Sequence, residues 1–239
     1  MTDVLQGYRD AWDKKPALRV TYYDIFDRIA SVCVSGPTLE IGAGIGKLRE
    51  RLPNVIASDI QFSPWLNLVA DAQNLPFREG MFGNIVMVDV LHHVEFPIRF
   101  LRAAGKVLRP GGRLVMVEPA ITWGSAFFYH WIHQEPVDMS AEIFSDGTPD
   151  PERNPYAANQ AIPTLLAEQS QRFHELVPEL RIVDVSWFSF AVYPLSGGFK
   201  RWTLVTEAMA RKGVKLERRF EAPFGRWLGF RMLIVIERQ

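Results

Sequence analysis

The chain has 239 residues, 48% of them hydrophobic, and its 27 basic side chains balance 27 acidic ones. This length favours a single domain over residues 1–239, and the lone Cys33 excludes an internal disulfide framework. The neutral balance argues against nucleic acid as a partner, because polyanion-binding proteins normally carry a basic excess. No apolar stretch approaches the roughly 20 residues of a membrane span, and the first residues lack the apolar region of a secretory signal, so we expect a cytoplasmic protein.

Strand and helix patterns alternate in the first half of the chain. We expect N-terminal helices over residues 1–36, because apolar side chains recur at helical spacing over 18–34. Nearly continuous apolar runs, typical of strands buried on both faces of a parallel sheet, occupy residues 38–42, 55–60, 68–71, 84–90 and 113–119. With a helix predicted over 97–108, this alternation predicts a doubly wound, Rossmann-like α/β sheet over residues 37–120, which binds ligands at the carboxyl ends of its strands.

The second half of the chain follows a different pattern. Residues 121–180 are expected to form an inserted helical cap, whose elements are a helix around 125–131, a polar, proline-rich loop at 145–156 and a helix at 162–177. Residues 181–239 are expected to hold the C-terminal strands and an intervening helix, namely strands at 181–190 and 229–238 and a helix at 199–212.

The most informative segment is Glu40-Ile41-Gly42-Ala43-Gly44-Ile45-Gly46, directly after the first predicted strand. A phosphate-binding P-loop requires four residues between its glycines and a hydroxyl after the lysine, and this segment has neither. A dinucleotide fingerprint is weakened because Lys47 stands where its third glycine belongs. The remaining E-x-G-x-G-x-G pattern resembles motif I of the class I S-adenosylmethionine-dependent methyltransferases.

Later segments resemble the same family in the same order. Asp59 ends the second predicted strand, and the segments VADAQNLPF (69–77), FGNIVMVDVLHHVEFP (82–97) and KVLRPGGRLVMVEP (106–119) follow. The segment at 82–97 is similar to the fourth-strand motif of the UbiE-like, type 11 small-molecule methyltransferases, and the segment at 106–119 to the helix, turn and strand that follow it there. The resemblance implies a seven-stranded sheet with an antiparallel last strand, and transfer of a methyl group from S-adenosyl-L-methionine by in-line displacement.

The resemblance also implies which residues bind the cofactor. Asp59 is placed on the ribose hydroxyls, and Asp71 and Ala72 on the adenine edge, while Glu40 supplies negative charge near the cofactor's ammonium group. The complete set of expected cofactor-binding residues is Glu40, Gly42, Gly44, Asp59, Ile60, Asp71, Ala72 and Asp89. Asp59 and Asp71 are only 12 positions apart, so the helix that the family usually fits between these strands must be short or lost. Ile60 and Trp65 are the candidates to cover the adenine face.

Histidines supply the candidate catalytic groups. His92 and His93 follow the fourth predicted strand, where they could face the cofactor, and His93 is our first candidate for a general base. His130 and His133, near Glu135 and Asp138, are further candidates. Two histidines three positions apart can bind a metal, but this spacing is common in ordinary helix packing and no cysteine supports it, so we expect no metal.

The acceptor is expected to be a small molecule bound by the cap at 121–180. No lysine or arginine occurs between residues 114 and 152, which favours a neutral or cationic acceptor, hydroxylated or aromatic. No pattern specifies an oligomeric state. Two alternatives stay open: an NAD(P)-dependent oxidoreductase on a related sheet, and a non-catalytic cofactor-binding scaffold protein.

Overall fold

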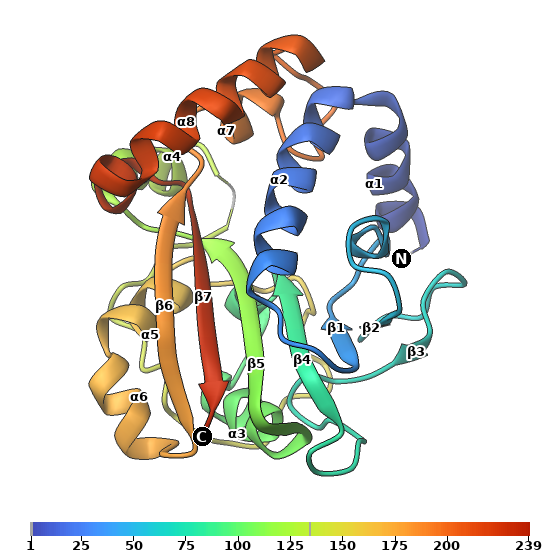
Figure 1. Ribbon diagram of the computed structural model, residues 1–239, viewed down its shortest axis with the longest axis vertical. Coiled ribbons are helices and arrows are strands. Elements are labelled where there is room, and N and C mark those ends of the chain that lie inside the picture. Colours follow the sequence, from blue (N-terminus) through green and yellow to red (C-terminus); the bar gives the residue numbers. More distant parts are fainter. Residues whose placement is uncertain (1, 134) are drawn as a thin grey trace.

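The computed structural model describes residues 2–133 and 135–239, and its centre is a seven-stranded sheet of order β3-β2-β1-β4-β5-β7-β6 (Figure 1). The strands are β1 (Thr38–Ile41), β2 (Val55–Asp59), β3 (Leu68–Val69), β4 (Phe82–Val88), β5 (Leu108–Pro119), β6 (Leu180–Phe188) and β7 (Arg231–Arg238). The first five pair in parallel, whereas β7 runs antiparallel to both β5 and β6. The predicted Rossmann-like sheet with an antiparallel last strand is therefore confirmed.

Helices cover both faces of this sheet (Figure 1). They are α1 (Thr2–Lys14), α2 (Pro16–Val32), α3 (Pro97–Val107), α4 (Trp123–Trp131), α5 (Ile162–Glu168), α6 (Ser170–Leu176), α7 (Val192–Ser196) and α8 (Glu207–Leu228), with short 3-10 turns at Leu48–Glu50 and Leu91–His93. Among the described residues, no helix combines the length and apolar character needed to cross a bilayer.

The core is divided by the alternation of side chains along each central strand. In β5, Leu114 and Met116 pack with the apolar side chains of α3, α5 and α6, whereas Val115 and Val117 pack with those of α2. Successive side chains of a strand point to opposite faces, so an unbroken apolar run is what a strand covered on both sides requires. This explains why the central strands could be recognised from sequence.

One local prediction is confirmed and two need correction. Residues 60–67 contain no helix, as the short spacing between Asp59 and Asp71 predicts. A loop joins β2 directly to β3, and the two strands pair at Ser58 and Leu68. The helix predicted at 162–177 is divided between α5 and α6 at Gln169. The helix predicted at 199–212 is wrong in position: α8 begins only at Glu207, where the Thr206 hydroxyl caps it by accepting from the Met209 N–H at 3.3 Å.

The segment predicted to be a cap serves two different purposes. Residues 132–133 and 135–161 contain no α-helix, and several of them line the cavity at the carboxyl ends of the strands. By contrast, Leu165 and Leu166 of α5 and Phe173 of α6 are buried in the core beneath the sheet. Helices α5 and α6 are thus largely structural, whereas α4 and the loops of the segment face the site.

Candidate functional site

A cavity of about 860 Å³ opens at the carboxyl ends of β1, β2, β4 and β5. All eight residues that the sequence assigns to the cofactor line it: Glu40, Gly42, Gly44, Asp59, Ile60, Asp71, Ala72 and Asp89. His93 and His133 line it as well, whereas the exposed His130 does not and instead bonds through Nδ1 to the Ala126 carbonyl at 2.8 Å. The structure therefore brings the predicted residues together, with His130 as the exception.

The glycine loop after β1 depends on backbone conformations that favour glycine. Gly42 and Gly44 have φ angles of 67° and 49°, in the left-handed region where a Cβ is strained. A Cβ on Gly42 would also lie 2.3 Å from a Val90 methyl, while one on Gly44 would meet open space. The backbone at Gly44 is thus bare towards the cavity, so a ligand can approach it closely.

Asp59 and Trp65 hold this loop in place. The Gly44 N–H donates to Asp59 Oδ2 at 2.9 Å, and the Trp65 indole N–H donates to the Gly44 carbonyl at 2.8 Å. Trp65 does not line the cavity, whereas Ile60 does and is 55% exposed. Of the two residues considered for the adenine face, Ile60 is the one available to a ligand.

Glu40 is a buried carboxyl group with an unused acceptor. Its side chain lies at the floor of the cavity, and among the described residues its Oε2 atom has no hydrogen-bond partner. Burial raises the pKa of Glu40 to about 8, with a smaller opposing influence from Arg49. A buried acceptor without a donor is costly, so this position favours a ligand that brings an ammonium group.

Asp89 is committed to an internal ion pair. Arg231 from β7, only 1% exposed, donates to both Asp89 oxygens, through Nη2 at 2.7 Å, and the Tyr22 hydroxyl donates to Oδ2 at 3.3 Å. Burial opposes ionisation of Asp89, but the Arg231 charge outweighs it and lowers the pKa of Asp89. Asp89 has a φ of 58°, so this pair also anchors a strained turn at the end of β4.

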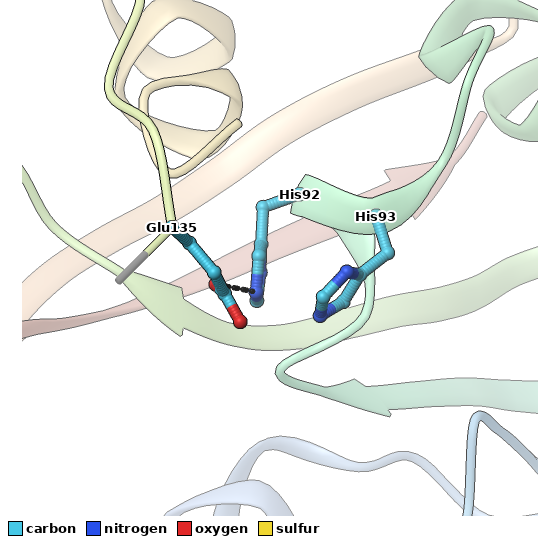
Figure 2. Close-up of side chains that lie close together, drawn as sticks. All are labelled: His92, His93 and Glu135. Carbon is cyan, nitrogen blue, oxygen red and sulfur yellow. Dashed lines mark ion pairs between the residues drawn. The ribbon is translucent and has the colours of Figure 1, made fainter. Parts of the chain in front are cut away.

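His92 lies between two carboxylates, of which Figure 2 shows Glu135. Its Nδ1 is 2.6 Å from the buried Glu118, and its Nε2 is 3.6 Å from Glu135. Glu118 also accepts the N–H groups of Val90 and Leu91, at 2.9 and 2.7 Å. Burial alone would lower the pKa of His92, but Glu118 and Glu135 raise it to about 9. His92 is therefore a fixed imidazolium at neutral pH.

The adjacent His93 has the opposite character. Its ring centre lies 4.2 Å from that of His92, and its Nδ1 is 3.4 Å from the Ala157 carbonyl. Burial and the neighbouring His92 charge lower the pKa of His93, so its imidazole is neutral near pH 7. A carbonyl can only accept, so Nδ1 carries the proton, and Nε2 keeps a lone pair that can accept one.

His92, His93 and Glu135 also form a group that could hold a metal, since their ligand atoms lie within 4.8 Å of one another. A metal would need the Nε2 lone pair of His92. At neutral pH that nitrogen is protonated and faces Glu135, whose pKa is lowered because its pairing with His92 outweighs its burial. The cluster is thus balanced in charge by protons alone.

The sequence did not identify much of the cavity wall. Aromatic side chains from three separated segments meet there: Tyr8 and Trp12 of α1, Phe128 and Tyr129 of α4, and Tyr193, Phe199 and Trp202 from α7 and the loop after it. Arg231 was also missed, because nothing near residue 231 marks it as a partner of Asp89. Its own sequence signal is an arginine at the start of an otherwise apolar strand.

The cavity is not free of cations, although the 114–152 segment is. Arg153, Lys200 and Arg231 all line it. Arg153 donates to the carbonyls of His93 and Ala157 at 2.8 and 3.1 Å, and Arg231 pairs with Asp89. Both arginines are already bonded to groups of the protein. Because cations from other segments line the cavity, the absence of cations from residues 114–152 restricts the charge of the acceptor less than the sequence suggested.

Comparison with known proteins agrees with this geometry. Residues 39–116 match a family model described as "Methyltransferase domain". Residues 39–116 therefore form a methyltransferase domain. The matched residues run from β1 into β5 and include the glycine loop, Asp59, Asp71 and the histidine pair. The narrower UbiE-like assignment stays a prediction.

Solved structures share the fold of this methyltransferase domain. A crystal structure of an S-adenosylmethionine-dependent methyltransferase from Thermotoga maritima has a TM-score of 0.57 and 15% identity, covering 93% of this chain and 92% of that one. One from Archaeoglobus fulgidus has a TM-score of 0.53 and 13% identity, covering 93% and 94%. A curated relative, an uncharacterized 37.1 kDa protein in transposon TN4556 of Streptomyces fradiae, is 30% identical over 131 residues. That match covers 49% of this chain and 36% of the relative.

Proposed function

We propose that the chain transfers the methyl group of S-adenosyl-L-methionine to a small-molecule acceptor held in the same cavity. The observation that carries this proposal is the meeting of a bare glycine loop, three carboxyl groups and a neutral histidine in one cavity. The cofactor, when bound, supplies an electrophilic methyl group on a sulfonium. The residues of this chain bind it, align the acceptor and exclude water.

The residues present fit the cofactor. The unpartnered Oε2 of Glu40 is suited to an ammonium group, and the free backbone at Gly44 admits a chain against it. Asp59 spends one lone pair of each oxygen on the N–H groups of Gly44 and Gln61, at 2.9 and 3.0 Å. A carboxylate has further lone pairs, so Asp59 can still accept from two ribose hydroxyls. Asp71 can accept from the adenine amine.

His93 is proposed as the general base for the acceptor. Its neutral Nε2 can take a proton from a hydroxyl as the methyl group arrives, which methyl transfer to a neutral hydroxyl requires. His92 is proposed as a positioning residue, because its charge keeps its neighbour neutral and Glu118 fixes its ring. The acceptor proposed is a hydroxylated aromatic molecule, which the ring-lined wall at Tyr8, Phe128 and Tyr193 would stack against.

Calorimetric titration with S-adenosyl-L-methionine and S-adenosylhomocysteine tests the cofactor part. We expect saturable binding that Asp59→Ala weakens by about 1–3 kcal/mol, the range for a lost hydrogen bond to a charged group. Asp184→Ala, an exposed aspartate on β6 outside the cavity, is the matched control and should bind normally. No binding by the wild type, or binding of NADH instead, would overturn the proposal.

Release of S-adenosylhomocysteine tests the catalytic part, using a panel of phenols and catechols with a matched panel of primary amines. We expect turnover with members of the phenolic panel. Cofactor binding without turnover on any acceptor would favour the scaffold alternative. Turnover confined to amines would contradict the assigned role of His93, since an amine that is already neutral needs no base.

A further inference from the structure

The outer face of α4 exposes large aromatic side chains in a row. Trp123, Phe127 and Trp131 are 81%, 68% and 79% exposed. Because these residues are four positions apart, they lie on one face of the helix. The opposite side of α4 contributes Phe128 and Tyr129 to the cavity. The core and the cavity therefore explain only the inner face of this helix.

The long helix α8 carries a second exposed apolar row. Leu216, Phe220, Phe224 and Trp227 are 54%, 46%, 47% and 64% exposed. Their spacing of four, four and three positions again places them on one helix face. Helical packing does not require this row, because α8 contacts the protein through other residues such as the buried Ala210 and Gly225.

The two rows belong to helices that touch. A Cβ built on Gly124 of α4 would lie 2.9 Å from Leu228 Cα of α8, and Figure 1 shows α4 beside the carboxyl end of α8. We call the exposed side chains together the α4–α8 apolar surface, defined by Trp123, Phe127, Trp131, Leu216, Phe220, Phe224 and Trp227. Exposed aromatic groups of this number mark an interaction surface rather than random exposure.

Cations accompany this surface on α8. Lys212, Lys215 and Arg219 are exposed, and no carboxylate among the described residues lies within ion-pairing distance of them. Of the three acidic side chains of this helix, Glu217 and Glu221 bond to the body of the protein, while Glu207 pairs with Arg211 one turn along α8. Glu217 accepts the N–H groups of Ala191 and Val192 at 2.7 and 2.8 Å. The solvent side of α8 is therefore apolar and positive at once.

The second acidic residue of α8 that bonds to the body of the protein is Glu221. It accepts two hydrogen bonds from the guanidinium group of Arg28 in α2, at 2.7 and 2.9 Å. Glu217 and Glu221 are thus bonded to the body of the protein, while Lys212 and Lys215 are exposed to solvent. A partner that fits the α4–α8 apolar surface must offer both an apolar region and negative charge.

We propose that the α4–α8 apolar surface binds the interface of an anionic phospholipid bilayer. Tryptophan is favoured at the boundary between lipid and water because its ring is amphipathic. A helix with an apolar stripe flanked by lysine and arginine lies in the plane of such an interface. The three tryptophans and four further apolar groups would enter the boundary, while Lys212, Lys215 and Arg219 would meet the lipid phosphates.

A second copy of the chain fits this surface less well. In a two-fold dimer both copies contribute the same patch, so the interface would hold the three unpaired cations twice without an anionic counterpart. A lipid surface supplies the missing negative charge. The proposal concerns the outer face only and does not depend on the proposed methyl transfer.

Vesicle sedimentation of the full chain tests the proposal. We expect binding to vesicles of phosphatidylcholine mixed with phosphatidylglycerol, weaker binding to phosphatidylcholine alone, and release by added salt. Replacing Trp123 and Trp227 together by serine should abolish the binding. The matched control is Phe62→Ser, which removes an aromatic side chain of 77% exposure from the loop after β2 and should bind like the wild type.

Charge reversal provides an independent arm of the test. Lys212→Glu, Lys215→Glu and Arg219→Glu combined should weaken partition on the order of 100-fold or more, because each basic side chain near the surface contributes about 1 kcal/mol. These residues lie outside the cavity, so circular dichroism should show an unchanged fold. Equal binding by this variant and the wild type would overturn the proposal. Absent vesicle binding together with a concentration-dependent dimer would replace it by a contact between copies.

Discussion

The two ends of the cavity are built in different ways. The end proposed for the cofactor comes from one contiguous stretch, in which Glu40 lies in β1, Asp59 ends β2 and Asp71 follows β3. The end proposed for the acceptor is assembled from α1, α4 and the loops after it, and α7 with its following loop. Parallel strands bring their carboxyl ends to one edge, so chain order alone specifies the first end. The second end depends on packing between distant segments.

The ion pair between Asp89 and Arg231 connects the two ends, and breaking it is expected to have the largest effect on stability. Asp89→Asn keeps the shape of the side chain and tolerates the positive φ, but leaves the buried Arg231 without its counter-charge. We expect a loss of about 3 kcal/mol in the free energy of unfolding, measured by urea denaturation.

Asp146→Asn is the matched control for this change. It breaks the exposed pair with Arg102, which joins two side chains of 43% and 49% exposure, and should cost no more than about 1 kcal/mol. Adding Arg231→Met to Asp89→Asn should recover part of the loss, because an apolar side chain no longer needs a counter-charge. Equal costs for the two single variants would show that the buried pair has no special role.

His93→Ala should affect turnover far more than binding, if His93 is the base. We expect kcat to fall by about 10²–10⁴-fold with an acceptor hydroxyl, because that is the usual contribution of a positioned base. The affinity for S-adenosyl-L-methionine should stay within about threefold of the wild type. The parallel variant His130→Ala, at an exposed position outside the cavity, should leave kcat unchanged. A His93→Ala enzyme with normal kcat would remove His93 from the mechanism.

The pKa of Glu40 predicts a dependence of cofactor binding on pH. In the free protein this pKa is raised to about 8 by burial, so the carboxyl group is largely protonated at pH 6–7 and must lose its proton to receive an ammonium group. Cofactor affinity should therefore rise with pH over this range, with about one proton released per molecule bound. Calorimetry in buffers of different ionisation enthalpy measures that proton, and Glu40→Gln should abolish it.

The His92 cluster predicts a dependence of stability on pH. The pKa of His92 is raised to about 9 in the folded protein, against about 6.5 when unfolded. The stabilisation is then fully present below pH 6.5 and is lost as the pH rises towards 9. Thermal unfolding between these values should show a falling Tm. Glu118→Gln should flatten the fall, and a Tm that rises over this interval in the wild type would contradict the assignment.

Removal of divalent metals should have the smallest effect. His92 has its two nitrogens directed at Glu118 and Glu135, so the cluster is expected to work as a proton-bearing unit. Treatment with EDTA should leave the Tm and the turnover unchanged. A lower Tm after chelation that zinc restores would show instead that the proton on His92 gives way to a metal.

The sequence predicted the cofactor end because its signals are local. A glycine loop directly after a strand and carboxylates at strand ends need no knowledge of distant packing, and all eight predicted residues line the cavity. His133 lines it too, whereas the neighbouring His130 faces solvent on the other side of α4. Only the direction of each side chain distinguishes these two histidines, and spacing does not specify that.

The acceptor end was less accessible for the same physical reason. Tyr8 is separated from Phe199 and Trp202 by most of the chain, and an aromatic residue in a sequence looks the same whether it packs in a core or lines a cavity. The helix predicted at 199–212 was also misplaced. In the structure α8 continues through Gly213, which packs closely on Val192, where a Cβ would lie 2.5 Å from a methyl group.

The place of β7 in the sheet has a consequence for synthesis of the chain on the ribosome. The strand order sets β7 between β5 and β6, so β6 has no hydrogen-bonded neighbour while it waits for β7 to emerge. Until then Asp89 also lacks Arg231. The glycine loop can be made early, but its neighbouring turn is secured only by Arg231, 142 positions after Asp89 in the chain. A nascent chain therefore completes its ligand site late, after the sheet has closed around β7.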